Sequence, residues 1–401
     1  SDSPSLTGGD YANPTEIGLL ALSWIGAYEM DRPWSPAWPQ VEGELLSLLT
    51  ILRGWQSGAQ DYQPNGPNSY NKSVFYQWYW INEKEPVVSP REEDHLVPAI
   101  DNAWLAASLI TIREYAELNE HAEVAQKADA ILLDMDFTLW YDDAAHRFKW
   151  GGIEDPQGGG DLDYFSNENR IVNFVAYALG QLSREEFEAS LDALVQEPAT
   201  YSDIVVEKVA WDGSYFTYAA PALFIREMQT TYGANTIVPA TLAQISFAQD
   251  QGYTAWGLSD CFDAGAGDYV EQGSPPAAGP GLPEARPGLV TPHAAALALI
   301  TPLAPESVTN LRAISQTWPA AYDADYGFRD SVMAKPGDGR YGMPSDRFST
   351  LSQEWLFLAI VNMQTETIWS HFYRDTGVIK AHQVMFGLSP VYLPVVLLNE
   401  S

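Results

Sequence analysis

The sequence predicts an all-α protein, built as a single (α/α)6 toroid whose long loops line a central cleft. Apolar residues recur at helical spacing in twelve segments of the 401-residue chain. Strand patterns are confined to short runs at 74–81 and 202–207, each of which could form a hairpin on one rim. Because no low-complexity linker divides the chain, one domain over 1–401 is expected, with a two-domain helical bundle as the alternative.

The predicted helices follow one another closely along the chain. In the clearest of them, Leu105, Leu109, Ile112 and Ala116 fall on one face. The twelve segments are 14–30, 40–54, 102–117, 121–139, 167–181, 184–196, 215–231, 236–250, 289–301, 304–317, 350–365 and 367–374.

Two of these helices carry recognisable start signals. Asn13 stands before a proline, and Ser183 stands before an acidic first turn. In a toroid, six inner helices would point their N-terminal ends and connecting loops at a cleft. The loops rich in Gly, Pro and Asp are long enough to carry function, and they span 61–71, 151–163, 261–288 and 333–346.

The composition excludes several classes of partner. The net charge of −32 repels phosphate backbones and anionic lipid, so neither nucleic acid nor a membrane surface is expected as a partner. Cys261 is the only cysteine, which excludes an internal disulfide and a cysteine zinc site. No histidine pair has metal-binding spacing, and no nucleotide-binding glycine motif is present, so neither a metal nor another cofactor is expected. We expect a monomer.

The location of the protein stays open. No 18-residue apolar run and no signal peptide is present. The chain begins without methionine, which suggests a processed or trimmed product, and a secreted or periplasmic location is compatible with this.

Aromatic residues make up 12% of the chain, including 14 Trp and 21 Tyr. Aromatic faces stack on the C–H faces of sugar rings, although large cores use aromatics too. A glycan-cleaving enzyme also needs two carboxyl groups, one to protonate the leaving oxygen and one to activate water or attack the sugar carbon.

Several acids are candidates for this chemistry, and each has a structural alternative. Glu168 precedes an apolar helix, where it could instead complement the helix dipole. Asp101 and Asp212 also stand at helix starts and could be caps, and Asp260 could be an ordinary turn aspartate. Three further acids could simply be solvated surface residues: Glu271, Asp330 and Glu354.

Several segments, taken together, resemble the glucoamylase-like (α/α)6 glycoside hydrolases, the group of β-1,2-glucanases and the cyclising domains of cyclic β-1,2-glucan synthases. Asn167-Glu-Asn-Arg170 is similar to that family's Ser-Glu-Ala-Arg, and Trp256-Gly-Leu-Ser-Asp260 to its Trp-Gly-Ile-Ser-Glu. The matches run in family order over nearly the whole chain. The other similar segments are 13–18, 75–79 with Trp78, 100–105 with Asp101 and Trp104, 134–137, 211–216 with Trp211 and Asp212, 290–295 with His293, and 326–328.

The resemblance implies roles for individual residues. Glu168 falls on the family's general acid, Asp260 on the nucleophile of the cyclising domains, and Asp101 on an acid that grips sugar hydroxyls. Trp104, Trp211 and Trp256 would stack on sugars. The remaining expected substrate contacts are Trp78, Asp212, Glu271, His293 and Asp330, and His293 could instead orient a neighbour or pack.

Three positions depart from the family pattern. Thr217 replaces a glutamate, Glu354 stands in Ser352-Gln-Glu354 where the family has Asp-Gln-Gly, and Asp260 is one methylene shorter than the family's glutamate. If the enzyme inverts, its base must therefore lie elsewhere than in the family pattern, and Glu354 or Asp260 is the nearest substitute.

The sequence thus predicts a glycoside hydrolase acting on a polysaccharide, with β-1,2-glucan as the expected substrate. The alternatives are a glycosyltransferring or cyclising enzyme, an enzyme of the same fold acting on another glycan, and a non-catalytic glycan-binding protein.

Overall fold

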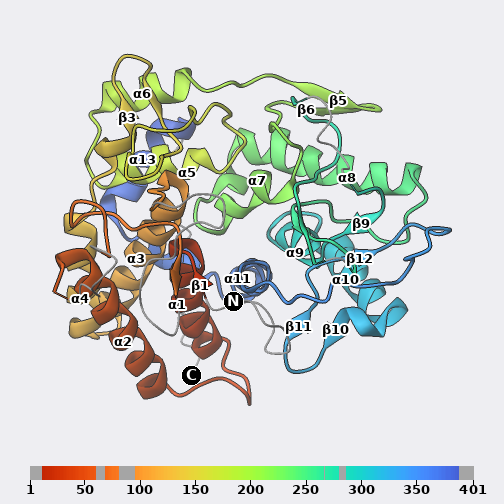
Figure 1. Ribbon diagram of the computed structural model, residues 1–401, viewed down its shortest axis with the longest axis horizontal. Helices are drawn as coiled ribbons and strands as arrows, with labels where there is room; N and C mark the ends of the chain where they lie inside the picture. Colours follow the sequence, from red (N-terminus) through yellow and green to blue (C-terminus); the bar gives the residue numbers. More distant parts are fainter. Residues whose placement is uncertain (1–10, 60–67, 81–94, 266, 280–285, 388–401) are drawn as a thin grey trace, which may run out of the picture.

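The computed structural model describes residues 11–59, 68–80, 95–265, 267–279 and 286–387. Thirteen α-helices lie in these ranges, whereas each strand in them is only two or three residues long (Figure 1). The prediction of an all-α protein is therefore confirmed. The predicted loops 61–71 and 261–288 fall partly outside the described residues, as does the end of the run 74–81.

Six helices form an inner ring, in which α1 packs on α3, α3 on α5, α7 on α9, α9 on α11, and α11 back on α1. These helices are buried on most sides, because each has neighbours both along the ring and outside it. The inner helices are α1 (Pro14–Glu29), α3 (Ala99–Leu118), α5 (Asn169–Ala178), α7 (Tyr215–Ala219), α9 (Pro292–Leu297) and α11 (Thr350–Thr365).

Outer helices alternate with the inner ones along the chain and cover them. In α4, for example, Val124, Ala128 and Ile131 form one buried stripe, while the opposite face carries polar residues. The outer helices are α2 (Trp38–Ser57), α4 (Ala122–Asp134), α6 (Arg184–Asp192), α8 (Val238–Asp250), α10 (Ala304–Thr317), α12 (Thr367–Phe372) and an additional α13 (Thr376–Phe386) that packs on α5 and α6.

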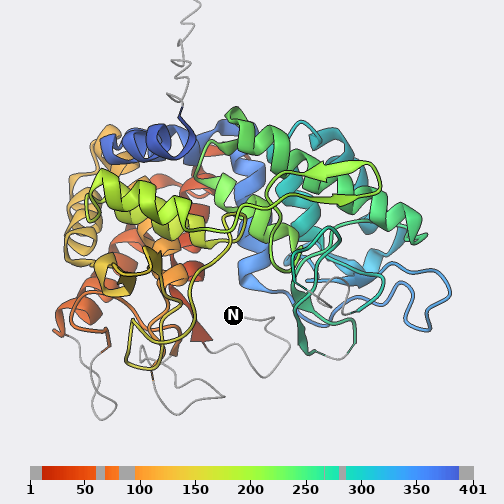
Figure 2. The same ribbon diagram turned by 90° about the horizontal axis from the view of Figure 1, so that it is seen from above.

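The junction between α5 and α7 differs from the rest of the ring, because its backbone contacts are the sparsest of the six. Figure 1 shows α1 to α6 with α13 on one side of the molecule, α7 to α10 on the other, and α11 between them. Figure 2 shows that the loops following β4 and β7 project toward the same face of the molecule. Both sides of the molecule thus contribute loops to the same face.

Three predicted helices end or break differently in the structure. The segment 121–139 stops at Asp134, because Met135 is extended and Asp136 caps a separate 3-10 turn. The segment 215–231 is interrupted near Pro221 and continues as 3-10 turns. This is expected because proline has no backbone N–H to donate to the helix. The helix predicted over 289–301 begins only at Pro292, since Leu289–Val290 pairs as a strand.

The remaining short elements connect the helices. The 3-10 turns are η1 (Phe137–Trp140), η2 (Ala220–Leu223), η3 (Glu227–Gln229), η5 (Ala298–Ile300) and η6 (Pro319–Ala321), and η4 (Gly233–Ile237) is a π-helical turn.

Six two-stranded antiparallel sheets lie in the described ranges. The hairpin expected near 202–207 is confirmed as β5 with β6. The hairpin considered at 74–81 is wrong, because Tyr79–Trp80 pairs instead with Tyr11–Ala12 at the start of the described chain. The pairs are β1 (Tyr11–Ala12) with β2 (Tyr79–Trp80), β3 (Tyr141–Asp142) with β4 (Arg147–Phe148), β5 (Ala199–Tyr201) with β6 (Ile204–Val206), β7 (Cys261–Phe262) with β8 (Tyr269–Val270), β9 (Leu289–Val290) with β12 (Val332–Met333), and β10 (Tyr322–Asp323) with β11 (Gly327–Phe328).

Both predicted helix caps are present. Asn13 forms a capping box with Glu16, its Oδ1 accepting from the Glu16 N–H at 2.8 Å, and Ser183 forms another with Glu186. One continuous hydrophobic core runs from Ile17 to Ala381. This continuity favours the expected single domain, which stays a prediction.

Candidate active site

A cavity of about 720 Å³ opens at the N-terminal ends of five inner helices. This volume lies within the range of roughly 300–1,000 Å³ that is usual for ligand sites. Helix N-termini carry partial positive charge, so they favour carboxylates nearby. The cavity is lined by Thr15, Gln77, Leu96, Pro98, Ile100, Asp101, Trp150, Gly151, Asp161, Leu162, Asp163, Tyr164, Asn167, Glu168, Asn169, Trp211, Asp212, Phe216, Thr217, Asp260, Tyr269, Glu271, Leu351 and Trp355.

Glu168 lines this cavity and is the residue immediately before α5. Although it occupies the cap position, its side chain does not cap the helix. Instead, Glu168 Oε1 accepts a hydrogen bond from the indole Nε1 of Trp104 at 2.8 Å. Trp104 is fully buried, with its ring against Phe224 and Trp355. The expected stacking role of Trp104 therefore gives way to holding the carboxyl of Glu168 from within the core.

The environment of Glu168 raises its pKa to about 8. Burial is the largest cause, because it disfavours the charged form. The hydrogen bond from Trp104 and the positive charge of Arg170 act in the opposite direction, while the carboxylates of Asp101 and Asp212 raise the pKa further. The carboxyl of Glu168 is therefore mostly protonated at neutral pH, as a general acid must be.

Asp260 lines the same cavity from a different part of the chain. Its Oδ1 accepts from the backbone N–H of Gln272 at 2.8 Å, and its own N–H donates to Ser214 Oγ at 3.2 Å. Burial raises the pKa of Asp260 well above the ordinary aspartate value, and the charges of Asp212, Glu271 and Glu168 add to this.

Asp101 precedes Glu168 in the sequence and Asp212 follows it, and the charges of both raise the pKa of Glu168. Asp101 lies in the first turn of α3, where it accepts from Thr15 Oγ1 at 2.6 Å, and burial raises its pKa to about 6. Asp212 accepts from the N–H of Ser214 at 2.9 Å, and burial again raises the pKa to about 6. Neither carboxyl is the helix cap that was its structural alternative, because the cap positions of α3 and α7 are Pro98 and Ser214 and neither helix has a side-chain cap hydrogen bond.

The charge lining the cavity is strongly one-sided. Seven acids line it, whereas none of the described residues lining it is Lys, Arg or His. Glu271, the predicted substrate contact in the Gly/Pro loop, is exposed on its rim. Such a lining favours neutral or cationic ligands over anions.

The family model described as "Putative glucoamylase" matches residues 162–376, more than half of the chain. The chain belongs to this family. The match begins just before Glu168 and extends beyond Glu354, so both lie in the family region. None of the curated protein sequences matches the chain significantly.

Solved structures share the fold of this putative glucoamylase family member at low identity. An endo-β-1,2-glucanase from Chitinophaga pinensis, in complex with sophorotriose and glucose, has a TM-score of 0.75 and 14% identity over 94% of this chain and 88% of that one. A β-1,2-glucanase from Parabacteroides distasonis has a TM-score of 0.74 and 18% identity, covering 94% of this chain but 55% of that one. An endo-β-1,2-glucanase mutant from Talaromyces funiculosus has a TM-score of 0.64 and 12% identity over 96% and 85%. The predicted (α/α)6 fold is thereby confirmed.

Glu354 does not line the cavity, although the next residue on α11, Trp355, does. Its side chain is buried, and among the described residues neither carboxyl oxygen has a hydrogen-bond partner. Burial, with the charge of Glu16 as a smaller cause, raises the pKa of Glu354 well above the ordinary value. In this family member, Glu354 is a neutral core residue beside α1 rather than a group facing a substrate.

Five predicted substrate contacts also lie away from the described cavity lining: Trp104, His293, Asp330, Trp256 and Trp78. His293 is buried against Trp355, with its Nδ1 3.9 Å from Asp330 Oδ1, and burial lowers its pKa to about 3. A neutral imidazole packed behind the cavity wall corresponds to the packing alternative for this residue. Trp256 is likewise buried, and Trp78 packs edge-on against Tyr11.

Several lining residues were not anticipated from the sequence. The most exposed aromatic residues in the lining are Trp150, Trp211 and Tyr269, which are 53%, 41% and 59% exposed. Only Trp211 was predicted. Trp150 stands directly before the Gly-rich loop 151–163, and an aromatic residue at the start of a long loop is a signal that could have found it.

Among the residues that the structure describes, no cluster of three or more His, Cys, Asp or Glu is arranged to hold a metal ion. No helix in the described ranges combines the length and apolar character needed to cross a membrane.

Proposed function

We propose that this protein is a glycoside hydrolase that cleaves a β-1,2-linked glucan, with Glu168 as the general acid and Asp260 as its partner carboxylate. The observation that carries the proposal is the carboxyl of Glu168, which lines the cavity, is held by Trp104 and has a pKa of about 8. The family and the three solved β-1,2-glucanases of similar fold support the choice of substrate class.

In the proposed reaction, Glu168 donates its proton to the glycosidic oxygen as the bond to the anomeric carbon breaks. In molecules whose Asp260 is ionised, that carboxylate takes a proton from a water molecule, and the water oxygen forms the new bond to the anomeric carbon on the other side. Burial and the negative charges of Asp101 and Asp212 raise the pKa of Glu168 and so keep the proton on it until the leaving oxygen takes it. Asp101 and Asp212, whose carboxyls each accept a hydrogen bond from the protein, would bind sugar hydroxyls. Trp211 would stack on a sugar ring.

The length of Asp260 favours an inverting reaction. An aspartate carboxyl is withdrawn by one bond, about 1.5 Å, relative to the glutamate of the similar cyclising domains. Inverting enzymes separate their two carboxyls by about 6.5–9.5 Å to admit a water molecule, whereas retaining enzymes need about 5–5.5 Å for direct attack. Withdrawal of Asp260 would leave that room for water.

A panel of purified glucans tests the substrate class. Reducing ends should appear with β-1,2-glucan and not with β-1,3-, β-1,4- or α-linked glucans. Proton NMR during the first minutes should show the new reducing end as the α-anomer. Cleavage of another glucan alone would refute the linkage, an initial β-anomer would refute inversion, and longer or cyclic products would establish transfer. Calorimetric binding without turnover would establish a non-catalytic glycan-binding protein.

A further inference from the structure

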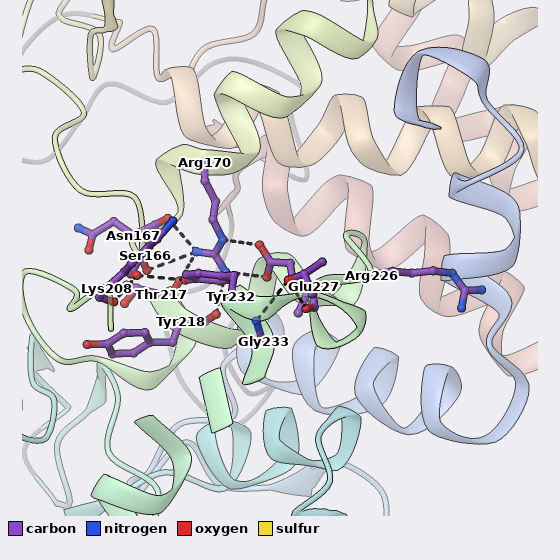
Figure 3. Close-up of polar contacts among 12 residues, drawn as sticks. Ser166, Asn167, Arg170, Lys208, Thr217, Tyr218, Arg226, Glu227, Tyr232 and Gly233 are labelled. Atoms are coloured by element: carbon purple, nitrogen blue, oxygen red, sulfur yellow. Dashed lines mark hydrogen bonds and ion pairs between the residues drawn. The ribbon is translucent and has the colours of Figure 1, made fainter. Parts of the chain in front are cut away.

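Arg170 lies two residues after Glu168, in the first turn of α5, and its side chain is fully buried. We propose that Arg170 is the positioning residue that fixes the general acid Glu168 relative to Asp260, with Glu227 as its required counter-ion. This inference rests on the proposed function, because it assigns Arg170 a role in that same reaction. Figure 3 shows its guanidinium at the centre of a network of polar contacts.

One side of the guanidinium holds the turn that carries Glu168. Arg170 Nη1 donates to the carbonyl oxygen of Asn167 at 2.9 Å and, more weakly, to that of Ser166 at 3.3 Å. These are the two peptide carbonyls immediately before Glu168. Ser166 is also fixed by its hydroxyl, which accepts from Tyr232 Oη at 3.1 Å. The backbone leading into Glu168 therefore has little freedom to shift.

The other side of the guanidinium holds α7. Arg170 Nη1 donates to Thr217 O at 2.8 Å, and Nη2 donates to Tyr218 O at 2.7 Å. The residue before α7, Ser214, accepts from the N–H of Asp260. Arg170 is thus the link between the segment that carries Glu168 and the segment that anchors Asp260.

The same link spans the part of the inner ring where direct packing is weakest. The contacts between α5 and α7 are the sparsest around the ring, so side-chain interlocking contributes less to their relative position there. In place of this interlocking, one planar guanidinium donates four hydrogen bonds to peptide carbonyls. Because the fork is rigid, a displacement of α7 would carry the turn at Glu168 with it.

Glu227 balances the buried charge of Arg170. Its two oxygens accept from Arg170 Nε at 2.6 Å and Nη2 at 3.0 Å, and both side chains are 0% exposed. The ring of Tyr232 lies 5.1 Å from the guanidinium carbon. Gly233 lets the chain pass close by, since a Cβ there would lie 2.4 Å from the carbonyl oxygen of Glu227. Removing one partner alone would leave a buried charge without its counter-ion.

The charge of Arg170 also acts on Glu168, which provides a signature that a merely structural role would not produce. Arg170 lowers the pKa of Glu168. Neutralising Arg170 should therefore raise that pKa, while neutralising Glu227 should lower it, because the positive charge of Arg170 is then uncompensated. The two variants are expected to move the alkaline limb of the pH profile in opposite directions.

The test uses Arg170→Gln, Glu227→Gln, the double variant and Arg170→Lys in the full chain, assayed on β-1,2-glucan. Each single Gln variant should lower kcat on the order of 10- to 100-fold, as expected for a displaced catalytic group. The alkaline limb should move up by on the order of half a pH unit in Arg170→Gln and down by a similar amount in Glu227→Gln. The double variant should return the limb toward the wild-type position while kcat stays low.

Arg113→Gln is the matched control. Arg113 also forms an ion pair between helices, with Asp375, but it lies about 18 Å further along α3 than Asp101. This variant should lose thermal stability and keep both kcat and the pH profile. If Arg170→Gln does not fold, Arg170→Lys, which keeps the charge but not the fork, should lower kcat without moving the limb.

Leaving-group dependence completes the test. The acidic phenol of an aryl glycoside leaves without protonation. The loss of kcat caused by Arg170→Gln or Arg170→Lys should therefore be much smaller on such a glycoside than on the glucan. Equal losses on both substrates, or an unmoved alkaline limb in both single Gln variants, would overturn the positioning role. Full activity of Glu168→Gln would instead overturn the proposed function itself, so the two failures are distinguishable.

Discussion

Replacing Glu168 by Gln is the most direct perturbation of the proposed mechanism. Gln keeps the shape of the side chain and an oxygen that can accept from Trp104, whose Nε1 lies 2.8 Å from Glu168 Oε1. It removes only the transferable proton. A general acid contributes about 100- to 10,000-fold to the rate, so kcat on β-1,2-glucan should fall by that factor, about 2.7 to 5.4 kcal/mol.

The pKa of Glu168 predicts how the activity depends on pH. With a pKa of about 8, Glu168 is about nine-tenths protonated at pH 7 and about one-tenth at pH 9. Wild-type kcat/KM should therefore decline through pH 8, and this limb should be absent from the residual activity of Glu168→Gln. Initial rates between pH 5 and pH 10, measured by reducing-end release, provide the comparison.

Two controls separate lost chemistry from lost structure. Glu306→Gln, on the exposed surface of α10, should leave the profile unchanged. Because the pKa of Glu168 is raised on folding, the stability of its neutral form is present below the unfolded value of about 4.3 and is lost as pH rises through about 8. Glu168→Gln should thus melt higher than wild type at pH 9 but not at pH 4. An active Gln variant that retains the alkaline limb would refute the assignment.

Three further predictions concern the surroundings of the site. Glu354→Gln should keep kcat within about threefold, because Glu354 lies outside the cavity lining. The raised pKa of Glu354 means that its stabilising neutral form is lost as pH rises above about 4.3, so the variant's Tm should exceed that of wild type increasingly toward pH 9. A large loss of kcat would return Glu354 to the mechanism. Thr15→Val removes the hydroxyl that Asp101 accepts from at 2.6 Å, and should raise KM several-fold with little effect on kcat, as measured from initial-rate curves. The acidic lining predicts that a cationic iminosugar binds at least tenfold more tightly than its neutral isostere, and calorimetry at 20 and 500 mM salt should show this preference shrinking with salt. Equal affinity of the two ligands would contradict it.

The regular parts of this fold could be predicted from the sequence, because burial and helix capping leave local patterns. The segment 102–117 lies within α3, and the caps at Asn13 and Ser183 are where the residue types indicated. The break of the segment 215–231 was also readable, since Pro221 stands inside it. The helix α13 was missed even though Asp375 caps it and Gly387 ends it.

Side-chain direction was the part that local patterns could not supply. Trp104 on α3 and Trp355 on α11 are both buried, yet one holds Glu168 from behind and the other lines the cavity. Glu354 precedes Trp355 by one residue, about 100° around the same helix, which directs it into the core. The role of Arg170 depends on carbonyls more than forty residues away, a contact that no short motif encodes.

The order of helices around the ring has a consequence for synthesis of the protein. Because α11 packs on α1, the cavity joins Thr15 near the start of the chain with Trp355 near its end. A nascent chain still bound to the ribosome has no complete cleft until residue 355 has left the exit tunnel. Truncated products would therefore be inert toward glycans, and enzymatic activity reports that translation has passed the last inner helix.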